Sequence, residues 1–336
     1  MKHTLRSVLL SLTAAVLTLS TSLPGPIAHA ADTPVNGTGQ ALEIAPPVIN
    51  LSADPGQSVG TEISLRDVSS TNLLVTSEVN DFVASGEDGT PKILTGENQT
   101  SPYSMKSWIS ALPQLTLKSR QIERLPVKIN VPKDAAPGGY YAVIRFTAVA
   151  PDNTSQGLSL SASLGALVLL KVNGDAKEEL KVEQFSAIKS NGASSSLFES
   201  APITFVERLK NSGTVHEQPS GSIAITNMFG KKIANVNVNL PPRNILPNSI
   251  RRFEQKLDSS VIGNTMLFGR YTATLKLSYG TNGQTITDTV TFWVIPYTLI
   301  LIIVIGLIAL FFILKALMRR YNSHIVKSAR PKRRRW

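Results

Sequence analysis

The apolar run LILIIVIGLIALFFIL, from Leu299 to Leu314, constrains this chain more than any other feature. Its sixteen residues are uninterrupted, and no charged residue occurs between Asp288 and Lys315. A membrane-spanning helix needs roughly 20 predominantly apolar residues. The segment 296–318 supplies them if the Lys315 ammonium reaches the membrane surface. A helix buried in a protein core fits less well, so we predict one transmembrane helix over 296–318 that contacts membrane lipid.

The charges around this segment predict its orientation. Nine basic residues and no acidic residue follow Leu314, so the positive-inside rule makes 319–336 a basic cytoplasmic tail. Inner-leaflet lipid is the expected contact of this tail, and a cytoplasmic partner is the alternative. The residues expected at the two membrane interfaces are Trp293, Tyr297, Lys315, Arg319 and Arg320.

The first residues resemble an export signal. Lys2 and Arg6 precede an apolar stretch that ends in Ala28-His29-Ala30, which is typical of a signal peptide over 1–30. An uncleaved anchor is the alternative. Residues 31–40 form a polar leader. Together these features predict a single-pass type I protein of a bacterial cell membrane, with its large ectodomain outside.

The net charge of +11 reflects this topology. Outside the signal region and the tail, 23 basic residues face 23 acidic ones, so we expect no nucleic-acid surface on the outer face. The chain has no cysteine, which excludes disulfides, thiol nucleophiles and sulfur-ligated metals. This composition fits a bacterial surface protein.

The ectodomain has the period-two alternation of β-strands. LPVKINV, from Leu125 to Val131, and YTATLKLSY, from Tyr271 to Tyr279, place every second apolar residue on one face. A turn over 280–283 follows the second strand. The glycines of VPKDAAPGGYYAVIRF also lead into a strand, whereas a phosphate-binding glycine loop leads into a helix.

The two halves of the ectodomain repeat this pattern. Gly139-Tyr140-Tyr141 and Gly269-Arg270-Tyr271 each open the next-to-last strand of a half, and Gly-x-Tyr resembles the corner tyrosine of immunoglobulin-like sandwiches. We therefore predict an all-β ectodomain of two tandem antiparallel Ig-like β-sandwiches, over 41–173 and 177–295, followed by a single transmembrane α-helix.

Residues suited to catalysis are sparse. His216 is the one histidine of the mature ectodomain, and no spacing of histidines and carboxylates suggests a metal site. We expect no enzyme activity, no catalytic residue, no cofactor and no metal. A hydrolase with two carboxylates is the enzymatic alternative, although sugar-binding aromatic residues are few.

Two segments are candidate contact surfaces. Tyr103 and Trp108 lie in a long loop and are suited to stack on a sugar or a partner protein; the alternative places Trp108 in the core. Arg243, Arg251 and Arg252 lie in LPPRNILPNSIRRF and are suited to an anionic wall polymer, with a solvated rim as the alternative.

Several segments carry a resemblance to a known family. They are VPKDAAPGGYYAVIRF, FVERLKNSGTVHEQPSGSIAITN, NILPNSIRRF, FGRYTATLKLSYG and FWVIP. With the predicted architecture, they resemble the WxL-interacting proteins of Gram-positive bacteria. The resemblance implies that the first module binds peptidoglycan, that the second binds a host or partner surface, and that both assemble with WxL-domain proteins.

These observations lead to one main hypothesis and two alternatives. The main hypothesis is a membrane-anchored cell-surface binding or adhesion protein whose Ig-like modules contact the cell wall or a partner surface protein. The first alternative is an extracytoplasmic assembly factor or chaperone that pairs an open sheet edge with a client strand. The second alternative is a cell-wall hydrolase.

Overall fold

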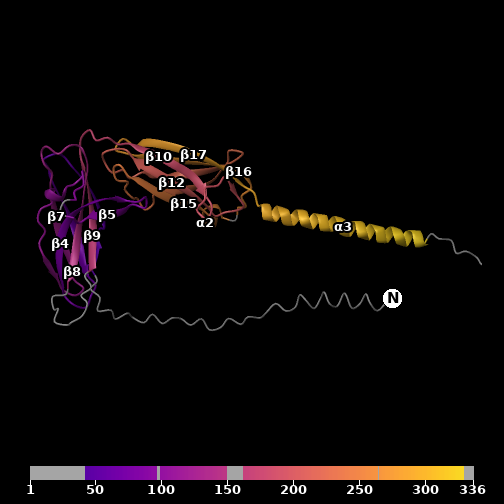
Figure 1. Cartoon of the computed structure of the whole chain (residues 1–336), viewed down its shortest axis with the longest axis horizontal. Coiled ribbons are helices and arrows are strands. Elements are labelled where there is room, and N and C mark those ends of the chain that lie inside the picture. Colours follow the sequence, from indigo (N-terminus) through magenta and orange to yellow (C-terminus); the bar gives the residue numbers. More distant parts are fainter. Residues whose placement is uncertain (1–41, 97–98, 150–161, 264, 329–336) are drawn as a thin grey trace, which may run out of the picture. The chain divides into compact units, whose positions relative to one another are not determined.

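A computed structural model describes residues 42–96, 99–149, 162–263 and 265–328. The predicted signal peptide over 1–30 and leader over 31–40 lie outside the described residues, as does the end of the predicted tail. Within them the chain is built of strands up to Val294 and of one long helix after it (Figure 1). The prediction of a mostly β chain with a C-terminal apolar helix is therefore confirmed.

The strands before residue 173 form a first pair of sheets. They are β1 (Leu42–Ala45), β2 (Val48–Ala53), β3 (Ser58–Asp67), β4 (Leu73–Ser85), β5 (Thr90–Leu94), β6 (Leu115–Leu117), β7 (Ile122–Asn130), β8 (Gly138–Val149) and β9 (Ala162–Val172), with a short 3-10 helix η1 (Lys106–Trp108). One sheet has the order β1-β3-β7. The other has the order β2-β9-β8-β4-β5, with β6 also beside β4.

The strands after residue 179 form a second pair of sheets. They are β10 (Leu180–Ile188), β11 (Leu197–Phe198), β12 (Ile203–Asn211), β13 (Ser220–Asn227), β14 (Lys232–Val238), β15 (Ile250–Leu257), β16 (Gly269–Tyr279) and β17 (Gln284–Val294), with one helical turn α2 (Ser259–Ile262). One sheet has the order β10-β12-β15, and the other has the order β11-β17-β16-β13-β14.

The two sheet pairs have the same topology. In each pair the first strand joins the three-stranded sheet, and the second strand crosses to the larger sheet and pairs in parallel with the last strand. All other pairings between strands are antiparallel. This arrangement is that of an Ig-like sandwich and supports an internal repeat. The division into two separate domains at the predicted boundaries stays a prediction.

Each sheet pair encloses its own hydrophobic core. In β7 the side chains of Leu125, Val127 and Ile129 are buried in the first core, as their alternation predicts. In β16 the alternate residues from Tyr271 to Tyr279 are buried in the second core. Burial of a single large apolar side chain stabilises the folded state by about 1.5–3 kcal/mol, so these rows fix which face of each strand points inward.

The corner tyrosine of the first half is Tyr140, which corrects the predicted frame. The Tyr140 hydroxyl donates to the carbonyl of Ala136 at 3.0 Å. In the second half the Tyr271 hydroxyl donates to the carbonyl of Phe268 at 3.3 Å. Gly138 and Gly269 occupy equivalent positions, because each lies opposite the last residue of the neighbouring strand. The motif of the first half is therefore Gly138-Gly139-Tyr140, and strand alternation sends Tyr141 to the opposite face.

Helix α3 (Tyr297–Ser328) contains the apolar run (Figure 1). An 18-residue window of its segment Tyr297–Arg319 has a mean hydropathy of 3.1, and none of that window is buried by other parts of the described chain. This segment is long and apolar enough to cross a membrane. The helix continues to Ser328, so the first residues of the basic segment are also helical.

Candidate functional site

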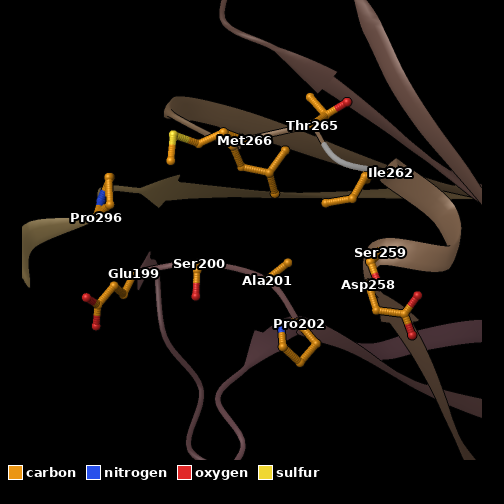
Figure 2. A pocket seen from close by; sticks show the side chains of 12 residues that line it. Glu199, Ser200, Ala201, Pro202, Asp258, Ser259, Ile262, Thr265, Met266 and Pro296 are labelled. Atoms are coloured by element: carbon orange, nitrogen blue, oxygen red, sulfur yellow. The ribbon is translucent and has the colours of Figure 1, made fainter. Parts of the chain in front are cut away.

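A groove of about 550 Å³ lies at the end of the second sheet pair (Figure 2). Ala201 and Pro202 lie on one side of this groove, and Ile262 and Met266 lie on the other. Pro296, the last residue before α3, also lines it. The groove is therefore mostly apolar and lies where the chain leaves the sheets for the apolar helix.

The predicted contact arginines lie where the two sheet pairs touch. The turn between β4 and β5 reaches the edge of β15, where the Arg252 amide donates to the carbonyl of Glu87 at 2.7 Å. The Glu87 carboxylate also forms a two-point ion pair with Arg208 of β12, with the Nε contact at 2.7 Å. Hydrogen bonding to Arg208 holds the pKa of Glu87 below its usual value. The Arg252 guanidinium itself pairs with Glu254 at 2.8 Å.

Arg251 is half-buried in this contact. Its guanidinium donates to the carbonyls of Asn244 at 2.7 Å and Asp88 at 3.1 Å, but its Nε is buried without a partner among the described residues. Gly89 makes this position possible, since a Cβ there would collide with the guanidinium. Burial, with the charge of Arg243 adding to it, lowers the pKa of Arg251.

Arg243 and Arg251 line a second groove of about 320 Å³. Its other walls include Val48, Leu167 and Phe82 from the first sheet pair. Two like charges beside an apolar wall, with one guanidinium nitrogen unpartnered, would be stabilised by an anion. We call this feature the arginine groove.

The predicted aromatic contacts are occupied by the protein itself. The Tyr103 hydroxyl accepts a hydrogen bond from Asn248 at 2.8 Å, and its ring packs edge-on against Tyr141. Trp108 lies against Tyr140, with ring centroids 4.4 Å apart, and packs at the border of the first core. The structure thus places both aromatic side chains in intramolecular packing.

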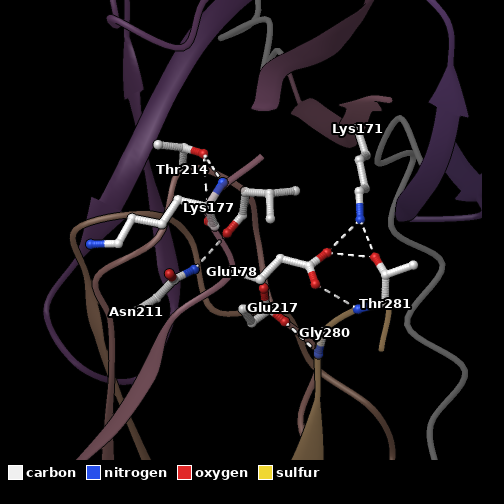
Figure 3. Close-up of polar contacts among 9 residues, drawn as sticks. Lys171, Lys177, Glu178, Asn211, Thr214, Glu217, Gly280 and Thr281 are labelled. Carbon is white, nitrogen blue, oxygen red and sulfur yellow. Dashed lines mark hydrogen bonds and ion pairs between the residues drawn. The ribbon is translucent and has the colours of Figure 1, made fainter. Parts of the chain in front are cut away.

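A polar network joins the link between the sheet pairs to the turn after β16 (Figure 3). Glu178 accepts from Lys171 Nζ at 2.6 Å and from the Thr281 amide at 2.7 Å. Burial would raise the pKa of Glu178, but these hydrogen bonds outweigh it and the pKa is lowered. Glu217 accepts from the Gly280 amide at 2.9 Å. Burial, followed by repulsion from Glu178, raises the pKa of Glu217 to about 7.

His216 lies beside this network and packs edge-on against the Tyr141 ring, with centroids 5.6 Å apart. Burial, with the charge of Lys171 adding to it, lowers the pKa of His216 to about 4, so its imidazole is neutral at pH 7. Among the described residues no group of three or more histidines or carboxylates is arranged to hold a metal ion.

The second sheet pair has a long unpaired strand edge that the sequence interpretation did not single out. Of the 11 residues of β17, only Trp293 and Val294 pair with β11, which leaves nine with no hydrogen-bonded strand on that side among the described residues, although β10 of the other sheet packs close to β17. The Trp293 amide donates outward to Ser196, so alternation gives Thr285, Thr287, Thr289 and Thr291 outward-directed amides as well. The sequence feature that could have indicated this edge is the row of four threonines that alternates with Ile286, Val290 and Phe292.

The Asp288 side chain partly blocks this edge. Its side chain is on the face of β17 that carries the buried Phe292, and its carboxylate accepts the outward Thr289 amide at 2.7 Å. An inward-facing charge on an edge strand opposes uncontrolled pairing with other strands. The outward backbone groups of the β17 edge are therefore mostly unpaired with another strand, and Asp288 partly blocks the edge at its centre.

Residues predicted at the membrane interfaces lie near or on α3. Trp293 and Tyr297 are exposed at its start, and the Lys315 ammonium lies 6.0 Å from the Phe311 ring centroid. Arg319 is exposed, and Arg320 lies on the same helix. Their contact with lipid stays a prediction.

Comparisons with known proteins do not assign this chain to a family. No family model matches it, and no curated protein matches it. Among solved structures, the YadV chaperone is 12% identical with a TM-score of 0.36, covering 75% of this chain and 99% of its own. The class 5 fimbriae chaperone CfaA is 13% identical with a TM-score of 0.35, and the match covers 74% of this chain and 98% of CfaA. The E. coli chaperone DraB is 15% identical with a TM-score of 0.34, covering 76% and 97%. Similarity at this level carries no inference about what this chain binds.

Proposed function

We propose that this chain is a membrane-anchored extracytoplasmic assembly factor that binds a partner polypeptide by adding its strand to the edge of β17. The observation that carries the proposal is the run of nine β17 residues that have no hydrogen-bonded strand on their outer side within the described part of the chain. The charge distribution supports the type I orientation, with the sheets outside the membrane and the C-terminus in the cytoplasm.

The β17 edge suits this mode of binding. Nine extended residues span about 30 Å, which accommodates a whole partner strand. Main-chain hydrogen bonds then supply affinity, and side-chain contacts along the strand supply specificity. The side chains of Thr285, Thr287, Thr289 and Thr291 are exposed on one face of this strand, so they leave access to the backbone.

Site-specific photo-crosslinking in living cells tests this function. A photoreactive phenylalanine analogue at Thr291 is expected to capture a partner protein, which mass spectrometry then identifies. Thr287→Pro removes an outward amide without breaking a hydrogen bond to β16, so it should abolish the adduct while the fold persists. The matched control Thr287→Ala keeps that amide and should keep the adduct. An adduct of equal yield in Thr287→Pro would contradict strand addition.

The arginine groove favours a second candidate function, which is binding of the cell wall or another anionic surface. Arg243 is exposed and repels the half-buried Arg251, so a phosphate or carboxylate would relieve that repulsion. Full-length protein in detergent should co-sediment with purified Gram-positive wall at low salt and less at high salt. Arg243→Gln should weaken this retention, whereas the exposed Arg270→Gln should not. Equal retention of both variants would contradict a role for the groove.

Membership in the WxL-interacting family, with a WxL-domain protein as partner, stays a proposal that rests on the sequence resemblance.

A further inference from the structure

The end of the second sheet pair that leads into α3 carries exposed apolar side chains. Phe229 is 85% exposed and Met228 51%, both in the turn between β13 and β14. Met266 is 70% exposed and Phe268 59%, both in the segment before β16. Exposed apolar side chains that gather in one place are typical of a protein or membrane contact surface. We call these four residues the apolar rim.

Chain connectivity puts the apolar rim close to the start of α3. β17 ends at Val294 and α3 begins at Tyr297, so about 10 Å of chain joins them at most. Gly269, at the start of β16, lies opposite Val294 in the register. Neighbouring strands are about 4.8 Å apart, so the rim lies within a few strand widths of the helix.

The two parts of the rim touch each other. The end of the Met228 side chain lies where a Cβ on Gly269 would stand, and Gly269 directly follows Phe268. At the same end, Glu199 accepts a hydrogen bond from the Thr298 hydroxyl in the first turn of α3. The rim, the groove of Figure 2 and the start of the helix therefore belong to one end of the molecule.

Basic side chains accompany the apolar ones. Lys231 lies in the same turn as Phe229, Lys232 opens β14, and Arg270 follows the second part of the rim; all three are exposed. Apolar side chains flanked by exposed cations match the boundary between acyl chains and anionic lipid headgroups. A purely apolar partner surface would leave these cations without counter-charges.

We propose that this end of the second sheet pair rests on the outer lipid surface, with Met228, Phe229, Met266 and Phe268 inserted at headgroup level. The proposal rests on the membrane anchorage proposed above. Because helix and rim would contact the same bilayer, the rim would hold the sheets at the membrane and limit their swivelling about residues 295 and 296. The C-terminal end of β17 would then lie near the membrane surface, and the rest of its edge would extend away from the membrane.

Single-cysteine labelling of the full chain tests this contact, because the natural sequence contains no cysteine. Phe229→Cys carries an environment-sensitive fluorophore, and the chain is reconstituted into phosphatidylcholine–phosphatidylglycerol vesicles with bromine on the upper acyl carbons. Asn282→Cys, in the exposed turn at the opposite end of β16 and β17, is the matched control. Leu301→Cys, in α3, reports whether the helix is inserted.

We expect blue-shifted emission and quenching by the brominated lipid at position 229, and neither at position 282. Quenching at 301 without quenching at 229 would overturn the rim contact and leave the anchor intact. No quenching at either position would overturn the anchorage and the rim contact together, while the crosslinking test of β17 would be unaffected. Shielding of position 229 from iodide without quenching by lipid would mean that protein covers the rim, which also overturns the proposal.

Discussion

Glu207 is the most unfavourably placed ionisable group of the second core. It lies on β12 between Phe185 of β10 and Phe253 of β15 in the register, and its side chain is fully buried. Neither carboxylate oxygen has a hydrogen-bond partner among the described residues. Burial raises the pKa of Glu207 from 4.5 to about 9, so the folded protein keeps this carboxyl protonated at pH 7.

The raised pKa makes stability depend on pH. Below pH 4.5 the folded and unfolded states both bind the proton, and the stabilising contribution is complete. Between 4.5 and 9 only the folded state binds it, so the free energy of unfolding falls by about 1.4 kcal/mol per pH unit. At pH 7 the loss amounts to about 3 kcal/mol, because pH 7 lies 2.5 units above 4.5.

Glu207→Gln keeps a neutral side chain of similar size and removes this loss. At pH 7 we expect amide-exchange protection of β12 to exceed that of the natural protein by about three-hundredfold, with the gap closing towards pH 4.5. Comparing the two proteins at each pH cancels the contributions of other titrating groups. Glu62→Gln, at an exposed position of β3, is the control and should leave β12 unchanged. A gap that is constant between pH 5 and pH 8 would refute the reasoning.

Two further substitutions and one titration test other parts of the structure. Asp288→Ala uncaps the Thr289 amide and should increase self-association in analytical ultracentrifugation; an unchanged sedimentation profile would argue against a guarding role. Gly89→Ala places a Cβ against the Arg251 guanidinium at a φ of +79° and should destabilise the fold by about 1–3 kcal/mol in urea titrations. For His216, burial lowers the pKa from 6.5 to about 4, so stability is lost as the pH falls from 6.5 to 4; an imidazole titration midpoint near 6.5 by NMR would contradict its burial.

The strand faces followed from the sequence because alternation is a local property. The row from Tyr271 to Tyr279 has one set of side chains pointing inward whatever lies elsewhere in the chain. The corner tyrosine was ambiguous for the same local reason. Two overlapping Gly-x-Tyr frames, ending at Tyr140 and Tyr141, fit the sequence equally well, and the first is selected by the hydrogen bond of Tyr140 to Ala136 and the pairing of Gly138 with Val172.

The contacts between the sheet pairs depend on residues far apart in the chain. Arg251 was identified as a contact residue, but nothing near it in sequence shows that its guanidinium lies against Gly89 and the Asp88 carbonyl. The same holds for Tyr103, which meets Asn248 across the junction. Sequence patterns predicted which residues are suited to contacts, whereas the choice between an internal and an external partner required the three-dimensional arrangement.

The guard on β17 also predicts what a partner strand must contain. A strand added to this edge needs the Thr289 amide, so it must displace the Asp288 carboxylate from that amide. The displaced carboxylate points to the inner face, where the partner residue opposite it also points. A lysine or arginine at that position would pair with it, whereas an apolar residue would leave a charge beside the core. Asp288→Asn keeps the acceptor but removes the charge. We therefore expect it to lower the adduct yield from Thr291, and equal adduct yields would show that the partner carries no matching cation.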